Sequence, residues 1–170
     1  EYIPQSYKVP QKPNITKLSD TAVNWFSSRS ITQEVLIANK IAITQDGNGI
    51  VFPYFRGGQL INYKTRLIAE KKFFQAKEAE PIMYNLDRIK GQRTIIVCEG
   101  EMDSLSWEVA GHTNHTSVNQ GAPNENDANV DKKLECITNC YDVFENAETI
   151  YLATDNDNNG QRLQSELIRR

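Results

Sequence analysis

Two stretches of the sequence decide the fold: TIIVCEGEMD at residues 94–103 and TIYLATDND at residues 149–157. Each begins with a continuous apolar run, which is typical of a strand buried on both faces of a parallel sheet. Each run leads into an acidic cluster, Glu99 to Asp103 in the first and Asp155 to Asp157 in the second. Helical patterns follow both clusters. The region therefore alternates strand and helix, as a parallel α/β unit does.

The chain before residue 93 has the pattern of an antiparallel meander. Glycine-rich turn signals separate apolar runs with strand character. Strands are expected at residues 41–44, 50–55, 59–67 and 71–74. Because side chains alternate along a strand, Lys64 and Arg66 are predicted on one face of the third strand.

The sequence indicates three parts. Residues 1–18 contain Pro4, Pro10 and Pro13 and predict an extended linker. Residues 19–92 predict a smaller α+β subdomain, in which helices follow the capping residues Ser19 and Thr32. Residues 93–170 predict the α/β unit. Its remaining elements are expected at 102–110 (helix), 115–118 (strand), 128–140 (helix) and from 160 onward (helix).

Charge is distributed unevenly along the chain. Residues 1–98 carry 14 Lys or Arg and 8 Asp or Glu, a net +6, whereas residues 99–170 carry 5 and 14, a net −9. A basic half suits polyanions and an acidic half suits cations, including divalent metals. The alternative is solvated surface charge without a function.

Composition excludes several classes of protein. No apolar run among the 170 residues reaches the length of a membrane span, and no signal peptide is visible. The three cysteines include no C-x-x-C pair, so a reducing compartment and the absence of structural zinc are expected. The chain lacks an initiator Met and stops in a helical pattern, so we expect a piece of a longer protein.

Five carboxylates are predicted at one edge of the parallel sheet: Glu99, Glu101, Asp103, Asp155 and Asp157. Ligands of open α/β sheets bind at this edge, beyond the carboxyl ends of the strands. So many like charges repel unless a cation lies among them, and oxygen ligands without His or Cys suit Mg²⁺ or Mn²⁺. The alternative is that Asp155 and Asp157 form a helix-capping loop and that Glu99 and Asp103 face water.

These residues resemble the TOPRIM (topoisomerase-primase) family. The resemblance rests on Glu99-Gly-Glu-Met-Asp-Ser-Leu-Ser106 after an apolar strand, and on Asp155-x-Asp157 followed by Gly160. Stretches similar to primases and primase-helicases of the phage and mitochondrial type lie at residues 51–66, 84–87, 117–122 and 144–155. The resemblance covers about residues 19–170. It implies a Rossmann-like TOPRIM sheet, truncated at the C-terminus, preceded by an α+β subdomain with an antiparallel sheet.

The resemblance implies a DNA primase core that makes short RNA primers on single-stranded DNA by metal-dependent nucleotidyl transfer. The family's catalytic, metal-binding acids match Glu99, Asp155 and Asp157. The acid that matches Asp103 also supports the metal, and Glu101 is a supporting acid. The implied cofactor is Mg²⁺ or Mn²⁺.

The basic half is expected to hold nucleic acid and nucleotide. Lys64 and Arg66 match a basic strand of the family, and Arg56, Lys71 and Lys72 are further candidates. Solvent-exposed strand charge is the alternative for all five. The implied partners are a single-stranded DNA template, ribonucleoside triphosphates and a replicative helicase, fused or separate, as in a primosome; no membrane is expected.

Two rival functions remain open at this point. Another TOPRIM activity, that of a nuclease or topoisomerase, would use the same acids to cut phosphodiesters. A catalytically inactive module would bind single strands with strong salt dependence but incorporate no nucleotide. The implied location is the cytoplasm of a bacterial or phage-infected cell, with an organelle matrix as the alternative, and activity of this piece alone is left open.

Overall fold

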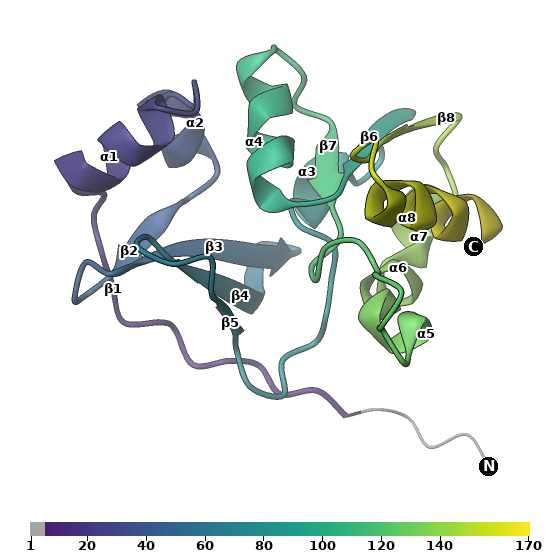
Figure 1. Ribbon diagram of the computed structural model, residues 1–170, viewed down its shortest axis with the longest axis horizontal. Helices are drawn as coiled ribbons and strands as arrows, with labels where there is room; N and C mark the ends of the chain where they lie inside the picture. The colour runs from purple at the N-terminus through teal and green to yellow at the C-terminus, as the bar shows by residue number, and fades with distance from the viewer. Residues whose placement is uncertain (1–5) are drawn as a thin grey trace.

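An antiparallel sheet and a parallel sheet, each with its own helices, lie side by side in the structure (Figure 1). The computed structural model describes residues 6–170. The first residues of the predicted linker, Pro4 among them, lie outside that range.

The elements are as follows. Sheet A consists of β1 (Ile15–Thr16), β2 (Ala42–Thr44), β3 (Gly49–Arg56), β4 (Gln59–Leu67) and β5 (Phe73–Gln75), paired in that order and antiparallel throughout. Sheet B consists of β6 (Thr94–Cys98), β7 (His115–Ser117) and β8 (Thr149–Ala153), parallel and in the order β7-β6-β8. The helices are α1 (Asp20–Ser27), α2 (Gln33–Ala38), α3 (Leu86–Ile89), α4 (Glu101–Val109), α5 (Val130–Lys133), α6 (Glu135–Asn139), α7 (Tyr141–Phe144) and α8 (Asn158–Arg169).

The hairpin between β3 and β4 determines the geometry of sheet A. Gly57 and Gly58 both have positive φ, which a two-residue hairpin turn of the primed type requires. The Asp87 carboxylate accepts hydrogen bonds from both glycine N–H groups, at 2.6 and 2.9 Å. Pro53 lies in β3 beyond the last residue that pairs with β2, so its missing N–H interrupts no ladder. The turn and the pairing of β3 with β4 set the position of β4, the strand that carries Lys64.

Sheet B is buried at its centre, whereas the edge strand β8, predicted as a buried strand, is largely exposed, with Ile150 at 43% and Tyr151 at 59%. The central strand β6 is apolar and buried along nearly its whole length. Its last residue, Cys98, pairs with Ala153 of β8, so both strands end at the same level. Asp157 caps α8 by accepting a hydrogen bond from Gly160 N at 2.8 Å. Residues that follow β6 and β8 therefore meet at one edge of the sheet.

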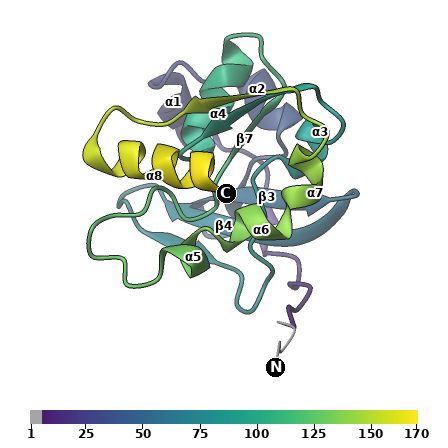
Figure 2. The same cartoon turned by 90° about the vertical axis from the view of Figure 1, so that its right-hand side faces the viewer.

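One hydrophobic cluster joins the two sheets. Phe26 of α1, Tyr54 of β3, Val97 of β6, Leu105 of α4 and Leu163 of α8 belong to it. Helix α4 lies between the two halves in the ribbon, and α8 packs on the side of sheet B that faces the viewer in Figure 2. The predicted fold class is confirmed, and the boundary predicted near residue 92 falls in the turn before β6, although the core runs across it. None of the helices within residues 6–170 combines the length and the apolar character that a membrane span requires.

Three element predictions need correction. Ile15 and Thr16 of the predicted linker pair with β2 and form an edge strand. The short fourth strand is β5, two residues later than expected, because its pairing with β4 begins at Phe73. The helix predicted at 128–140 is divided into α5 and α6 and is followed by α7, since the backbone leaves helical geometry at Leu134 and Cys140.

Candidate functional site

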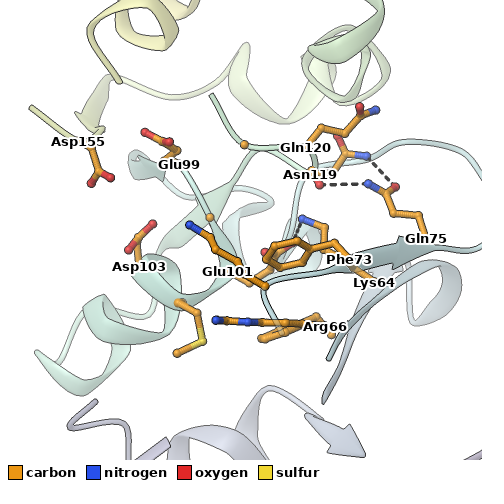
Figure 3. A pocket seen from close by; sticks show the side chains of 15 residues that line it. Lys64, Arg66, Phe73, Gln75, Glu99, Glu101, Asp103, Asn119, Gln120 and Asp155 are labelled. Atoms are coloured by element: carbon orange, nitrogen blue, oxygen red, sulfur yellow. Dashed lines mark hydrogen bonds and ion pairs between the residues drawn. The ribbon is translucent and has the colours of Figure 1, made fainter. Parts of the chain in front are cut away.

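Three carboxylates line one side of a cavity of about 600 Å³ between the two sheets. Glu99 follows β6, Asp103 lies in the first turn of α4, and Asp155 follows β8. Figure 3 shows the three acids together on one side of the cavity. Since β6 and β8 are hydrogen-bonded neighbours, the sheet topology brings together acids that lie more than fifty residues apart in sequence.

The electrostatics of these acids are those of crowded like charges. Burial raises the pKa of Glu99 above its usual value, and the neighbouring charge of Asp155 raises it further. Burial and Asp155 also raise the pKa of Asp103. The Oε2 atom of Glu99 is buried and has no hydrogen-bond partner among the described residues. An ionised carboxylate of this kind is costly without a counter-charge.

The loop after β8 is held tightly against the start of α8. A Cβ atom at Gly160 would lie 2.0 Å from the carbonyl oxygen of Asp155, so this position accepts only glycine without a backbone shift. Asp157 caps the helix, as the capping alternative expected, and lines a separate polar hollow with Asn124 and Arg162. Its charge still contributes to the raised pKa of Glu99. The structure thus places Asp155 in the cavity and Asp157 beside it.

Glu99, Asp103 and Asp155 are the side chains that could bind a metal ion in this cavity. Within residues 6–170, no group of three or more His, Cys, Asp or Glu side chains is already arranged to hold a metal ion. The chemistry of the donors nevertheless suits a hard cation, since Glu99, Asp103 and Asp155 offer only carboxylate oxygens. The unpartnered Oε2 atom of Glu99 and the raised pKa values of Glu99 and Asp103 are the features that a cation would relieve.

Lys64 and Glu101 form a buried ion pair between the two halves of the chain. Lys64 Nζ of β4 lies 2.5 Å from Glu101 Oε1 of α4, and their side chains are only 7% and 6% exposed. The Tyr54 hydroxyl donates a hydrogen bond to the same Glu101 oxygen. Glu101 therefore faces sheet A, and its charge is compensated separately from the other acids.

Arg66 and Lys71 line the side of the cavity that belongs to sheet A. Arg66 lies on the same face of β4 as Lys64, as predicted, and both line the cavity. The Arg66 guanidinium lies over the Trp25 ring at 4.7 Å and near the Phe73 ring at 5.7 Å from the ring centres. Burial lowers the pKa of Arg66 from its usual value. Because Arg66 and Lys71 line the cavity opposite Glu99, Asp103 and Asp155, cations face the acids, as Figure 3 shows for Arg66 and Asp103.

Two predicted basic residues do not line this cavity. Arg56 forms a bidentate pair with Glu80, at 2.7 and 2.9 Å, and donates a hydrogen bond to Asn139 O. Lys72 pairs with Glu70 at 2.6 Å on the exposed surface. Arg56 lies beyond a register shift that follows Tyr54 in β3, and Lys72 lies in the connection before β5, so strand alternation does not place either beside Lys64.

Sequence reasoning left out a polar group on the remaining wall of the cavity. Phe73 and Gln75 of β5 and Asn119 and Gln120, which follow β7, line the cavity. Asn119 lies beyond the carboxyl end of a parallel strand, so the argument applied to Glu99 and Asp155 would have identified it. Phe73 and Gln75 carry no such signal, because β5 belongs to the antiparallel sheet.

A sequence profile of a known family matches the second part of the chain. Residues 93–170 match the sequence profile of the family described as "Toprim domain". The parallel sheet and the acids after β6 and β8 agree with this match, which covers 78 of the 170 residues. The resemblance seen in the sequence is confirmed.

Individual relatives extend the comparison over the whole chain. The chain is 35% identical over 161 residues to a Twinkle homolog protein, chloroplastic/mitochondrial, of Arabidopsis thaliana, covering 90% of this chain and 23% of the relative. It is 36% identical over 161 residues to a primase homolog protein of the same plant, covering 90% of this chain and 48% of the relative. The chain thus spans less than half the length of both.

Solved structures agree on the fold. The primase fragment of the bacteriophage T7 primase-helicase superposes with a TM-score of 0.72 at 23% identity, over 94% of this chain and 67% of that one. The DnaG primase catalytic domain bound to ssDNA superposes with a TM-score of 0.60 at 13% identity, over 88% and 59%. The two-sheet arrangement is therefore shared by primase cores.

Proposed function

We propose that the chain is the catalytic core of a DNA primase, which synthesises short RNA primers on single-stranded DNA. The observation that carries the proposal is the cavity between the two sheets. Acids that follow β6 and β8 face Arg66 and Lys71 across a cavity with a volume of about 600 Å³. A cation on one side and fixed positive charge on the other suit the polyphosphate of a nucleotide. The primase relative and the primase-core fold support this assignment.

The proposed reaction joins two ribonucleotides. The 3′-hydroxyl oxygen of one attacks the α-phosphorus of the next, a new phosphodiester bond forms, and pyrophosphate leaves. Glu99, Asp103 and Asp155 would hold Mg²⁺ or Mn²⁺, with Asp157 fixing the loop that carries Asp155. When bound, the metal supplies neutralisation of phosphate charge and a lower pKa for the attacking hydroxyl.

The other charged residues bind and orient in this proposal. Arg66 and Lys71 bind phosphate oxygens of nucleotide or template, since both line the cavity. Lys64 is held in the buried pair with Glu101, so its principal role is to fix β4 against α4 and thereby the width of the cavity. Glu101 is accordingly a positioning residue. Arg56 and Lys72 remain candidates only for nucleic acid outside the cavity.

Partners and location follow from the proposed activity. The substrates would be ribonucleoside triphosphates paired on a single-stranded DNA template, and a replicative helicase would act beside or in the same polypeptide. The Twinkle homolog is named as chloroplastic/mitochondrial, which favours the organelle alternative over the bacterial or phage-infected cytoplasm.

Template-dependent synthesis by charge-matched variants tests the proposal. The chain is incubated with single-stranded DNA, ribonucleoside triphosphates and Mg²⁺ or Mn²⁺, and short RNA products are resolved on gels. Asp155→Asn should abolish product. Asp142→Asn, on the exposed surface of α7, should retain it. Cleavage of the DNA in place of synthesis would indicate a Toprim nuclease, and salt-sensitive binding without product would indicate an inactive binding module.

A further inference from the structure

One wall of the cavity, made by the Phe73 ring and the amide side chains of Gln75 and Asn119, has no role in the chemistry described above. Phe73 and Gln75 lie on the edge strand β5, and Asn119 follows β7 of sheet B. Figure 3 shows the three side chains together, on the side of the cavity away from Asp155. A ligand held by the acids would therefore meet this wall with another of its groups.

Two hydrogen bonds join Gln75 to Asn119 across the two sheets. Gln75 Nε2 donates to the backbone oxygen of Asn119 at 3.2 Å, and Asn119 Nδ2 donates to Gln75 Oε1 at 3.3 Å. Asn119 is fully buried, so its amide is fixed in one orientation. Its Oδ1 atom is buried and has no hydrogen-bond partner within residues 6–170. A buried acceptor without a donor is unfavourable, and a donor on a bound ligand would satisfy it.

The Phe73 ring lines the same wall as Asn119 and is accessible. Its side chain is among the exposed large apolar groups, at 45%. Lys64 Nζ and Arg66 Cζ each lie 5.7 Å from its ring centre. An accessible aromatic face flanked by cations is a surface on which a nucleobase stacks, with its phosphates near positive charge.

We infer that the Gln75–Asn119 amide pair, beside Phe73, recognises the exocyclic amine of a nucleobase bound in the cavity. The inference rests on the proposed function, which supplies a nucleotide as the ligand. Asn119 Oδ1 accepts a hydrogen bond from an amine such as N4 of cytosine. Uracil and thymine present a carbonyl oxygen at that position and offer no donor. The pair is thus a specificity determinant that favours amine-bearing bases.

Binding of matched pyrimidines tests the inference without catalysis. The affinities of the chain for CTP and UTP are measured by calorimetry with Ca²⁺ present to prevent turnover, and those for oligo(dC) and oligo(dT) are measured in parallel. Wild-type protein should prefer the amine-bearing base by about tenfold, the effect of one net hydrogen bond. Preference within the triphosphate pair identifies the base of an incoming nucleotide. Preference within the oligonucleotide pair identifies a template base.

Variants separate recognition from general binding. Asn119→Ala should reduce the ratio of the two affinities to about one. Gln75→Ala, on an exposed edge-strand residue whose loss leaves folding intact, should reduce the ratio by a smaller factor. Arg66→Ala should weaken both pyrimidines equally and leave the ratio unchanged. Thermal unfolding of each variant confirms that it is folded.

The failures of the two proposals are distinguishable. Equal affinity for both pyrimidines in the wild type, or a ratio that both amide variants leave unchanged, would overturn the inference while nucleotide binding itself stands. Absence of any binding to triphosphates and oligonucleotides alike would overturn the proposed function as well.

Discussion

Replacement of Lys64 by methionine should destabilise the protein by about 3 kcal/mol, because it leaves the Glu101 carboxylate buried without its cation. The two charged atoms lie 2.5 Å apart and their side chains are almost fully buried. Removal of one partner from such a pair typically costs about 3–5 kcal/mol. The lower end applies here because the Tyr54 hydroxyl still donates to Glu101 and the cavity borders the pair.

A second substitution tests whether charge is the cause. Lys64→Met combined with Glu101→Gln buries no charge and keeps an acceptor for Tyr54, so the double variant should be more stable than Lys64→Met alone by about 2 kcal/mol. Lys72→Met is the matched control, because its pair with Glu70 is exposed and its loss should not change stability measurably.

Urea unfolding followed by tryptophan fluorescence is measured for the wild type, Lys64→Met, Glu101→Gln, the double variant and Lys72→Met. The midpoint should fall in Lys64→Met and recover in the double variant, with an unchanged dependence of the free energy of unfolding on urea concentration. The reasoning is refuted if Lys64→Met is no less stable than Lys72→Met. It is also refuted if the free-energy changes of the two single substitutions simply add in the double variant.

Three further results are expected. Gly160→Ala should destabilise the protein by more than about 2 kcal/mol in thermal unfolding, because its Cβ would overlap the Asp155 carbonyl oxygen; wild-type stability would show that the loop has room. Burial lowers the pKa of His115 from its usual 6.5. The free energy of unfolding should therefore be highest above pH 6.5, where His115 is neutral in both states, and should decline as the pH falls below that value. His115→Asn should remove this decline, whereas His112→Asn, at an exposed position, should not. Arg66→Ala should lower the salt slope of single-strand binding by about 0.7, and an unchanged slope would exclude a phosphate contact.

Much of the fold follows from local patterns in the sequence. The apolar runs before Glu99 and Asp155 are strands, and the glycine pair at residues 57–58 is a hairpin turn. The break at Leu134 has no comparable signal, since Lys132, Lys133, Leu134 and Glu135 all favour a continuous helix.

The site was predictable where it depends on parallel strands. Acids at the carboxyl ends of β6 and β8 had to meet once those strands were neighbours, and alternation along β4 placed Lys64 and Arg66 together. The pairing of Lys64 with Glu101 depends on how sheet A packs against α4, which no local pattern encodes. The same holds for the contact between Gln75 and Asn119.

Anomalous diffraction from crystals soaked in manganese would locate the cation relative to both acidic clusters. We expect one peak within coordination distance of Glu99 and Asp155, lost in Asp155→Asn crystals and retained in Asp142→Asn crystals. A peak bound by one cluster alone, or no peak at saturating manganese, would contradict a metal site shared by the ends of β6 and β8.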